Sequence, residues 1–544
     1  MKVNFIIFLF FISLSLFPSF NSKNCTSNNY TEKMFCFQCS KTFNKAYCIE
    51  NGMCGKNSNL SILQDNLIGA LITLAQKERY TKESNILIIK SLYSTITNTN
   101  FDENYIKNLI NDVHKTSGDE NDFCLSDIWN SNEDIRSLKS LILFSLKGMA
   151  ACAYNAFILG YEDEEVNFFF YEVLQIISEE KYKEKLFPIF MQLGEINFKC
   201  LKLLEEANIN NFGEKNPIEV NSNIESGPFI IISGNDLVTL KWLLLHIENK
   251  NINIYTHGEM VIAHSYPELK KYKNLKGNIF INIENLQKDF NEIPAPILFT
   301  SDLLISPNKN NIEKIFTTNV VKFPNITYLG KKEFREVFQK SLELGGYKES
   351  QKKSGKNNGN KIITGFGRKF MISKIDEILN LIKLEKIKHF FILIGCDYNT
   401  NDNNKNYYTE FVKKTPNNTI ILTVGSLKFL FNDLKTEKIG NFPKIIDMGQ
   451  LTDIYGTIQF ILALSKKINI NNNINELPLS IIFSWYDEKT ISIFSSLLYL
   501  GIKNIKIGPD MPPFISTNVW KILVNYFDID VISTPDEDLK KLLG

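Results

Sequence analysis

The sequence feature that most constrains this chain is a group of four cysteines near its amino end. Cys36, Cys39, Cys48 and Cys54 lie close together, although the whole chain of 544 residues holds only 9 cysteines. The Cys-x2-Cys pair puts two sulfurs on one tight turn, and two more thiols on the return of a short loop can complete a four-thiolate shell around zinc or an iron–sulfur cube. The spacing is not that of a zinc ribbon, which repeats the short pair. It leaves three readings open: a metal centre, two disulfides, or ordinary buried cysteines.

Length and composition predict a globular protein with a large core. The hydrophobic share of 44% and the aromatic share of 12% are typical of such a chain, and 544 residues are enough for three ordinary domains. The net charge is only +1. A chain with no excess of either sign offers no field that would attract nucleic acid or an anionic membrane, so we expect no nucleic-acid partner.

Residues 1–22 differ from the rest of the chain and are interpreted as a signal peptide or targeting leader. Lys2 is followed by an apolar run from Val3 to Phe17, and then by Pro18. This run is too short to span a bilayer comfortably, and a short apolar run after a basic residue is typical of a signal peptide. We therefore expect entry into the secretory pathway, and no stable membrane span once the leader is removed.

The leader and the cysteine group make conflicting predictions. An oxidising lumen is a poor place for the free thiols that a cluster needs. Either the leader is the first half of a route into an organelle that builds clusters, such as a plastid, or the four cysteines form disulfides. The sequence leaves both open.

Hydrophobic periodicity divides the remainder of the chain into a helical part and two α/β parts. From Leu60 to Asn208 the apolar residues recur at helical spacing. After the polar stretch from Asn210 to Gly227, short apolar runs alternate with amphipathic helices, and a second polar break at Glu349–Lys361 precedes another such series. The strands expected in the two series are Phe229–Ile232, Ile252–Tyr255, Ile279–Ile281, Ile297–Thr300 and Ile315–Thr317, and then Phe390–Ile394, Thr419–Thr423, Lys444–Asp447, Ser480–Phe483, Ile505–Ile507 and Val531–Ile532.

This pattern predicts a multidomain α+α/β chain. Strands that alternate with helices favour parallel sheets covered by helices. We expect an N-terminal helical bundle followed by two Rossmann-like α/β domains with parallel sheets. The expected divisions are residues 1–22 for the leader, 23–215 for the cysteine group and helical bundle, 216–360 for the first α/β domain and 361–544 for the second.

Four strand ends in the last domain carry polar or reactive residues. They are Gly395–Asp397, Gly425–Ser426, Gly449–Leu451 and Ser484–Asp487. Ligands of such sheets gather at the carboxyl ends of the strands, so these segments are candidates for one site. Glycine-containing turns that simply end strands are the alternative reading.

The sequence that flanks the cysteines resembles that of a known family. Phe35–Cys39 and Gly52–Lys56 are similar to the opening of the hybrid-cluster proteins, the hydroxylamine reductase (prismane) family. Tyr255–Met260 and Ala263–Tyr272 are specific further matches, and the resemblance covers nearly the whole chain after the leader. It implies a helical domain, two α/β domains and a [4Fe–4S] cluster on Cys36, Cys39, Cys48 and Cys54. It also implies a second, mixed iron–sulfur–oxygen centre between the domains, at which the family reduces hydroxylamine or nitric oxide.

The resemblance can be followed residue by residue at this second centre. The family's ligating glutamate matches Glu259, its persulfide-bearing cysteine matches Cys396 and its lysine matches Lys489. The other positions depart from the family: the ligand histidine falls on Asn235, three ligand cysteines fall on Leu303, Ser426 and Leu451, and the second glutamate falls on Asp487.

These departures remove most of the donors that such a centre needs. Leucine has no lone pair, and a neutral hydroxyl is a poor ligand for a soft cluster compared with a thiolate. We therefore expect a [4Fe–4S] redox protein whose hybrid cluster is absent, with a role in electron transfer, sensing or scaffolding and an unidentified electron donor or acceptor protein as partner. Although the family is one of oxidoreductases, we expect this member to be inactive in its reaction. Two alternatives remain: an active hydroxylamine or nitric-oxide reductase with a remodelled metal site, and a secreted binding protein with disulfides.

Overall fold

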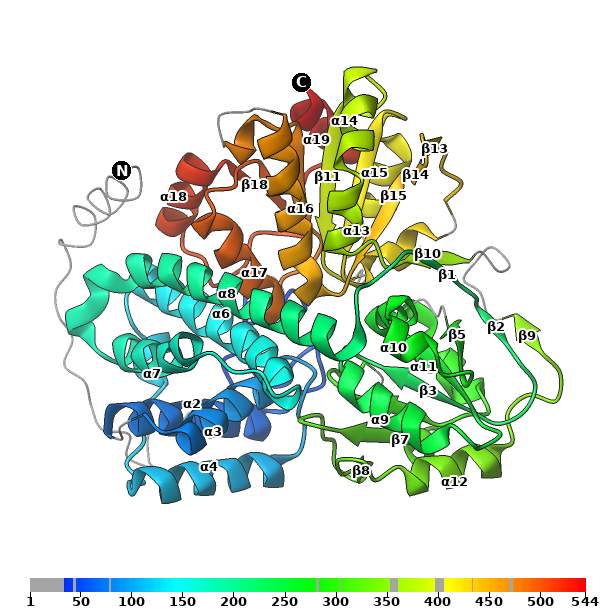
Figure 1. Cartoon of the computed structure of the whole chain (residues 1–544). Helices are drawn as coiled ribbons and strands as arrows, with labels where there is room; N and C mark the ends of the chain where they lie inside the picture. Colours follow the sequence, from blue (N-terminus) through cyan, green and yellow to red (C-terminus); the bar gives the residue numbers. More distant parts are fainter. Residues whose placement is uncertain are drawn as a thin grey trace.

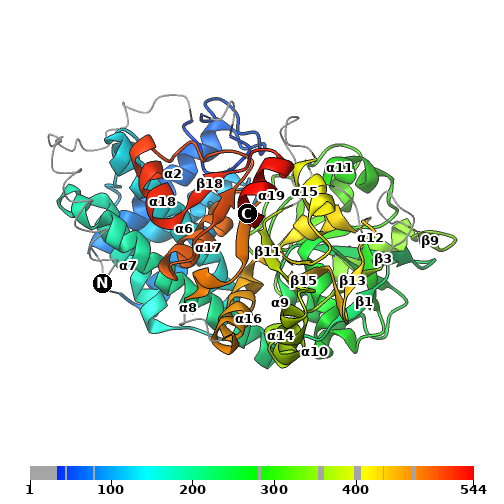
Figure 2. The same ribbon diagram turned by 90° about the horizontal axis from the view of Figure 1, so that it is seen from above.

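The computed structural model describes residues 34–42, 46–77, 80–279, 283–304, 306–352, 361–396, 406–432, 434–468 and 473–544. The leader lies outside these residues, and so does Asp397. Figure 1 shows a helical part beside two α/β parts, and Figure 2 shows the same arrangement from above. The mixed α/β architecture predicted from the sequence is therefore confirmed.

The helical part follows the segment that holds Cys36, Cys39, Cys48 and Cys54, which we call the cysteine loop. Polar side chains begin several of its helices; for example, Asp102 and Asp163 each accept hydrogen bonds from two backbone N–H groups of the first turn. Its elements are α2 (Ser58–Lys77), α3 (Lys82–Ser94), α4 (Glu103–Ser117), α5 (Ser126–Trp129), α6 (Glu133–Ile158), α7 (Glu164–Ser178), η2 (Glu180–Lys185) and α8 (Leu186–Phe212).

One helix of this part has the length and the apolar composition of a membrane span. Among the described residues, α6 alone is long and apolar enough to cross a bilayer, and 89% of its most apolar stretch is buried inside the protein. A buried helix in the core of a protein can have the same length and composition.

The first sheet has six parallel strands in the order β5-β4-β3-β6-β7-β8. Helices cover it, and separate apolar clusters lie on its two faces. The strands are β3 (Phe229–Ser233), β4 (Asn253–His257), β5 (Leu275–Ile279), β6 (Ile297–Phe299), β7 (Ile315–Thr318) and β8 (Thr327–Leu329), and the helices are α9 (Leu237–Ile247), η3 (Gly258–Ser265), α10 (Pro267–Lys270), α11 (Ile283–Glu292), η4 (Ile312–Lys314) and α12 (Arg335–Leu344).

The second sheet repeats this plan in the order β15-β12-β11-β16-β17-β18, again with parallel strands. Its strands are β11 (His389–Ile394), β12 (Thr419–Val424), β15 (Ile445–Gly449), β16 (Leu479–Phe483), β17 (Ile505–Ile507) and β18 (Ile529–Val531). Its helices are α13 (Arg368–Ser373), α14 (Ile375–Lys383), α15 (Tyr407–Lys414), η6 (Ser426–Phe431), η7 (Leu451–Asp453), α16 (Ile454–Lys467), η8 (Ile474–Glu476), α17 (Glu488–Tyr499), α18 (Thr517–Phe527) and α19 (Pro535–Leu543).

Short antiparallel pairs join the start of the first α/β part to its end. Strand β1 (Ile218–Val220) pairs with β10 (Ile362–Thr364), and β2 (Asn223–Ile224) pairs with β9 (Gln351–Lys352). A further pair, β13 (Lys438–Ile439) with β14 (Phe442–Pro443), lies in the second α/β part. The chain therefore enters and leaves the first sheet at neighbouring places.

The observed strands differ from the expected ones in three places. The strand expected at Val531–Ile532 is β18, which spans Ile529–Val531. The strand expected at Ile279–Ile281 is β5, which spans Leu275–Ile279; Lys276 and Asn278 hid its apolar pattern. The short edge strand β8 was not expected, since three residues give too little periodicity to detect.

Helix α17 follows β16 in the chain but packs against the helical part. A Cβ atom on Gly148 of α6 would lie 2.1 Å from the Glu488 carbonyl oxygen, and one on Gly194 of α8 would lie 2.2 Å from the Ser495 carbonyl oxygen. Glycine at these two positions lets the three helix backbones touch. As a result one apolar core runs through the helical part and the second α/β part.

Candidate metal centre and inter-domain pocket

The cysteine loop is held together by its own backbone. Cys36 and Cys48 exchange two hydrogen bonds, from Cys36 N to Cys48 O at 3.2 Å and from Cys48 N to Cys36 O at 2.8 Å. Cys39 and Cys48 are buried, whereas Cys36 and Cys54 are half-buried. All four are free thiols in the structure, so the loop is not closed by disulfides between them.

Aromatic rings surround one side of the loop. Phe37 is 4% exposed and contacts Trp129, Phe144 and Phe514, whose ring centroids lie 5.3, 5.8 and 6.1 Å from its own. Phe514 comes from the second α/β part, so residues far apart in the sequence enclose this loop. An apolar enclosure limits the access of water to the thiols.

Burial and charge act in opposite directions on the thiols of the loop. Burial raises the pKa of the Cys39 thiol, and the neighbouring Cys54 and Cys36 raise it further. Burial also acts to lower the pKa of Lys56, but the negative charges of Cys36 and Cys54 outweigh it and hold this pKa above its usual value. A buried ammonium group beside several thiols would offset part of the negative charge that thiolates bring to a metal centre.

The donor set of the loop fits a four-iron cube. Among the residues that the structure describes, no three His, Cys, Asp or Glu side chains lie close enough to hold one metal ion. A cube takes each thiolate on a different iron, so its ligands are spaced more widely than those around one ion. Four free thiols on one enclosed loop supply one ligand for each iron of a cube.

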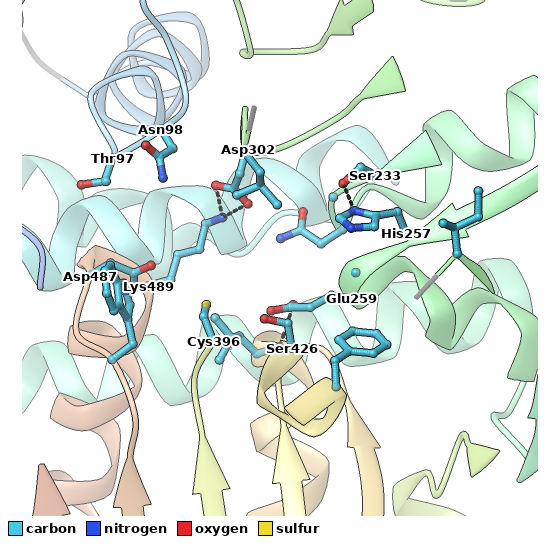
Figure 3. Close-up of a pocket in the computed structure, with 18 residues that line it drawn as sticks. Thr97, Asn98, Ser233, His257, Glu259, Asp302, Cys396, Ser426, Asp487 and Lys489 are labelled. Carbon is cyan, nitrogen blue, oxygen red and sulfur yellow. Dashed lines mark hydrogen bonds and ion pairs between the residues drawn. The ribbon is translucent and has the colours of Figure 1, made fainter. Parts of the chain in front are cut away.

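A second candidate site is a cavity of ≈ 90 Å³ between the helical part and the two α/β parts, which we call the inter-domain pocket (Figure 3). The carboxyl ends of strands from both sheets meet there, together with the segment after α3 and the start of α17. The residues that line it are Thr97, Asn98, Ser233, Gly234, Asn235, His257, Gly258, Glu259, Ile279, Asp302, Leu304, Cys396, Ser426, Phe429, Leu451, Trp485, Asp487 and Lys489.

Two glycines allow the strand ends of the second sheet to approach each other. Gly395 ends β11 with φ +131°, and Gly425 follows β12 with φ +98°. A Cβ atom on Gly425 would lie 2.4 Å from the Gly395 carbonyl oxygen. Only glycine combines this backbone with this contact, and the turn presents Cys396 and Ser426 to the cavity.

An ion pair crosses the cavity from one α/β part to the other. Lys489 Nζ donates hydrogen bonds to both carboxylate oxygens of Asp302, at 2.9 and 3.0 Å (Figure 3). Burial acts to lower the pKa of Lys489, but the charge of Asp302 outweighs it and raises that pKa. The ammonium group is therefore charged and its charge is offset within the protein.

Glu259 faces the same cavity and joins the two α/β parts. Its Oε2 atom accepts a hydrogen bond from the Leu451 backbone N–H at 3.1 Å. Burial raises the pKa of Glu259 to about 7, although this hydrogen bond and Lys489 act to lower it. The carboxyl group is thus partly protonated near neutral pH.

Two further polar side chains are screened from solvent at the cavity. His257 Nδ1 lies 2.9 Å from the Ser233 hydroxyl, and burial lowers the pKa of this histidine to about 4, so the ring is neutral. The Oδ1 atom of Asn235 is buried and accepts no hydrogen bond from any described residue. The cavity therefore contains an unused acceptor.

The positions that depart from the hybrid-cluster pattern do not all face the cavity. Asn235, Ser426, Leu451 and Asp487 line it. Leu303 does not; it is 5% exposed and packs in the apolar cluster on one face of the first sheet, while its neighbours Asp302 and Leu304 face the cavity. Asp487 caps α17, with Oδ1 accepting from the Thr490 backbone N–H at 2.9 Å.

The family matches Glu259, Cys396 and Lys489 all line the cavity. The sequence did not single out Asp302, whose role depends on a partner 187 residues away. Thr97, Asn98 and Ser233 were missed as well, because single polar residues next to helices and strands carry no recognisable signal.

The fold and these two sites together are those of an iron–sulfur enzyme family. The model of the Prismane/CO dehydrogenase family matches residues 34–540 of this chain. The chain is 39% identical to a protein named hydroxylamine reductase from Thermodesulfovibrio yellowstonii and 37% identical to one so named from Solidesulfovibrio magneticus; each match covers 94% of this chain and 100% of the relative. This chain belongs to the Prismane/CO dehydrogenase family.

Solved structures agree with this assignment at the level of the fold. Carbon monoxide dehydrogenase IV from Carboxydothermus hydrogenoformans superimposes with a TM-score of 0.56 at 14% identity, over 95% of this chain and 93% of that one. The predicted fold class and the predicted resemblance to the prismane family are both confirmed.

Proposed function

We propose that this protein carries one [4Fe–4S] cluster on Cys36, Cys39, Cys48 and Cys54, and serves in electron transfer, cluster-dependent sensing or scaffolding. Four free, enclosed thiols on one loop support this proposal. When bound, the cluster would supply one-electron redox chemistry. The chain supplies the thiolates, the aromatic enclosure and the charge of Lys56.

The inter-domain pocket is proposed to hold no hybrid cluster. The observation that carries this proposal is the Lys489–Asp302 ion pair, which crosses the cavity where the family has its second centre. Asp302 precedes Leu303, a position at which the family has a ligand cysteine, and Leu303 packs into the core. One thiol and two carboxyl groups remain, and Glu259 and Asp487 already accept hydrogen bonds from the backbone.

The proposed loss of the hybrid cluster implies a loss of the family's reaction. Reduction of hydroxylamine or nitric oxide needs a metal centre with an open position. Neighbouring groups tune such a centre by roughly 10–100-fold, but they do not replace missing ligands. We therefore propose that this chain is inactive in that reaction.

Iron and acid-labile sulfide per chain test the proposal. Anaerobically purified protein with one cluster holds about four irons per chain, whereas a protein with both centres holds about eight. About eight irons would favour the second candidate function, which is an active reductase with a remodelled metal site. Two observations support that candidate: relatives are named hydroxylamine reductase, and the cavity is present. Absence of iron, with disulfides among the four cysteines, would favour a secreted binding protein.

We also propose that the leader directs the chain into the secretory pathway, with a cluster-building organelle such as a plastid as its destination. The support is the short apolar run after Lys2. A fluorescent reporter fused behind residues 1–22 should leave the cytosol, and its retention there would contradict this proposal. An electron donor or acceptor protein in that compartment is the proposed partner.

A further inference from the structure

The first turn of α17 separates the cysteine loop from the inter-domain pocket. Consecutive residues of this turn serve the two sides: Lys489 reaches the pocket (Figure 3), while Glu488 is completely buried against the helical part. Because a Cβ atom on Gly148 would lie 2.1 Å from the Glu488 carbonyl oxygen, the turn is pressed directly onto α6.

Hydrogen bonds hold this turn next to the cysteines. Ser40, which follows Cys39, donates to the Tyr486 carbonyl oxygen through its backbone N–H at 2.9 Å and its hydroxyl at 3.0 Å. The Tyr486 N–H donates back to the Ser40 hydroxyl at 2.8 Å. Glu488 is two residues further on, so the turn that carries it is fixed to the residue that follows Cys39.

The carboxyl group of Glu488 is fixed but incompletely paired. Its Oε1 atom accepts hydrogen bonds from the Thr97 backbone N–H at 3.2 Å and the Thr97 hydroxyl at 3.3 Å. Its Oε2 atom is buried and has no hydrogen-bond partner among the described residues. Gln38, between Cys36 and Cys39, donates to the Thr97 hydroxyl at 3.4 Å, so the same network reaches the loop from a second direction.

We propose that Glu488 sets the reduction potential of the cluster held by the cysteine loop. Reduction transfers one electron from a reductant to the cluster and forms or breaks no covalent bond. A buried negative charge beside the cluster opposes the added electron, and such charges act strongly where water is excluded. The inference rests on the proposed function, since it requires a cluster on the four cysteines.

Lys56 supplies the opposite sign on the same loop. Its side chain is 6% exposed, and Nζ donates to Gln64 Oε1 at 3.1 Å. A lysine side chain carries a positive charge at neutral pH. Removing this charge should move the potential in the direction opposite to removal of Glu488.

The test is a dye-mediated redox titration of the full chain, with dithionite as reductant, followed by the visible spectrum and by electron paramagnetic resonance. It is run at pH 8.5, because burial raises the pKa of Glu488 to about 7 and the group is ionised above it. Glu488→Gln should make the midpoint potential more positive, by about 59 mV if the reduction equilibrium changes tenfold. Lys56→Met should make it more negative.

Thr97→Val is the matched control, because it removes one hydrogen bond to Glu488 and leaves the charge in place. The midpoint potential of Thr97→Val should differ less from that of the unaltered protein than the midpoint potential of Glu488→Gln does. A control shift as large as that of Glu488→Gln, or shifts of the same sign in Glu488→Gln and Lys56→Met, would overturn the inference. So would an unchanged potential in Glu488→Gln.

The design separates this inference from the proposed function. Absence of any cluster signal in the unaltered protein would contradict the proposed function itself. If Glu488→Gln does not fold, Glu488→Met replaces it, because it also removes the buried charge and keeps a side chain of similar length. The midpoint potential should again become more positive, and an unchanged potential would overturn the inference.

Discussion

The cysteine loop and the inter-domain pocket differ in how far their residues follow the family pattern. The loop keeps all four thiols of the family's first cluster, within an enclosure that residues from two parts of the chain complete. The pocket is built from strand ends of both sheets and from the glycine turns after β11 and β12. We propose that it lacks the family's histidine and three of its cysteines. The comparison teaches that a fold can hold the shape of a site after most of its donor atoms have changed.

The largest effect is expected at the loop. Cys39→Ser should abolish the visible chromophore and most of the bound iron, because a hydroxyl is a poor ligand for a soft cluster. Cys152→Ser is the matched control: this cysteine is buried in the helical part and should leave the spectrum unchanged. Intact disulfides among Cys36, Cys39, Cys48 and Cys54, found by mass mapping of freshly isolated protein, would contradict the cluster.

The second prediction concerns turnover at the pocket. The unaltered protein should reduce neither hydroxylamine nor nitric oxide above the background of free cluster iron, even with a strong artificial reductant, because the open metal centre is missing. The converse variant restores His at Asn235 and Cys at Leu303, Ser426 and Leu451 together, and should gain iron. Robust turnover by the unaltered protein that is lost in Glu259→Ala would contradict this prediction and show that the chain is an active reductase.

The third prediction uses the pH dependence of stability. Glu259 has a pKa of about 7 in the folded protein and an ordinary value of 4.5. The folded state therefore binds more protons between these values, so this group makes the free energy of unfolding fall as pH rises from about 4.5 to 7. The loss should be on the order of 1–2 kcal/mol after allowance for partial exposure.

Glu259→Gln should flatten this slope in urea unfolding measured across the same pH range. A carboxylate bound to metal stays ionised, and its pKa is then low in the folded state. An identical slope in the variant would therefore contradict the raised pKa of Glu259, and a slope that becomes more negative in the variant is the result expected if Glu259 were held ionised by a metal.

The smallest effect is expected for the ion pair across the pocket. A double-mutant cycle with Asp302→Asn and Lys489→Met should give a coupling free energy of about 1 kcal/mol, because the pair is only partly exposed, at 26% and 12% of the two side chains. Urea unfolding of the four proteins measures it. A coupling of zero would mean that Lys489 is engaged elsewhere, and would weaken the contrast between the two sites.

The sequence predicted the regular part of this structure because its signals are local. Apolar runs such as His389–Ile394 are long enough to recognise, and glycines such as Gly395 and Gly425 mark where strands end. The same reasoning placed Cys396 and Ser426 at the end of one sheet, where the structure also has them. Short or polar strands, such as Thr327–Leu329 and Leu275–Ile279, were missed or displaced.

What the sequence did not predict depends on contacts between distant segments. The pair of Lys489 with Asp302 joins two α/β parts, and neither residue indicates its partner. Helix α17 also packs closely on the helical part because Gly148 and Gly194 have no side chain, and a glycine inside a helix is a weak signal on its own. Leu303 shows a further limit, since a residue-by-residue match placed it at the second centre and its side chain packs away from the cavity.

The most direct measurement of the central claim is the location of iron in crystals grown anaerobically, from anomalous scattering at the iron absorption edge. The account predicts one compact group of iron peaks, enclosed by Cys36, Cys39, Cys48 and Cys54, and no iron peak in the cavity between Glu259 and Lys489. Iron density bonded to Glu259 or Cys396 would contradict the account, because it would show that the pocket still holds a metal centre.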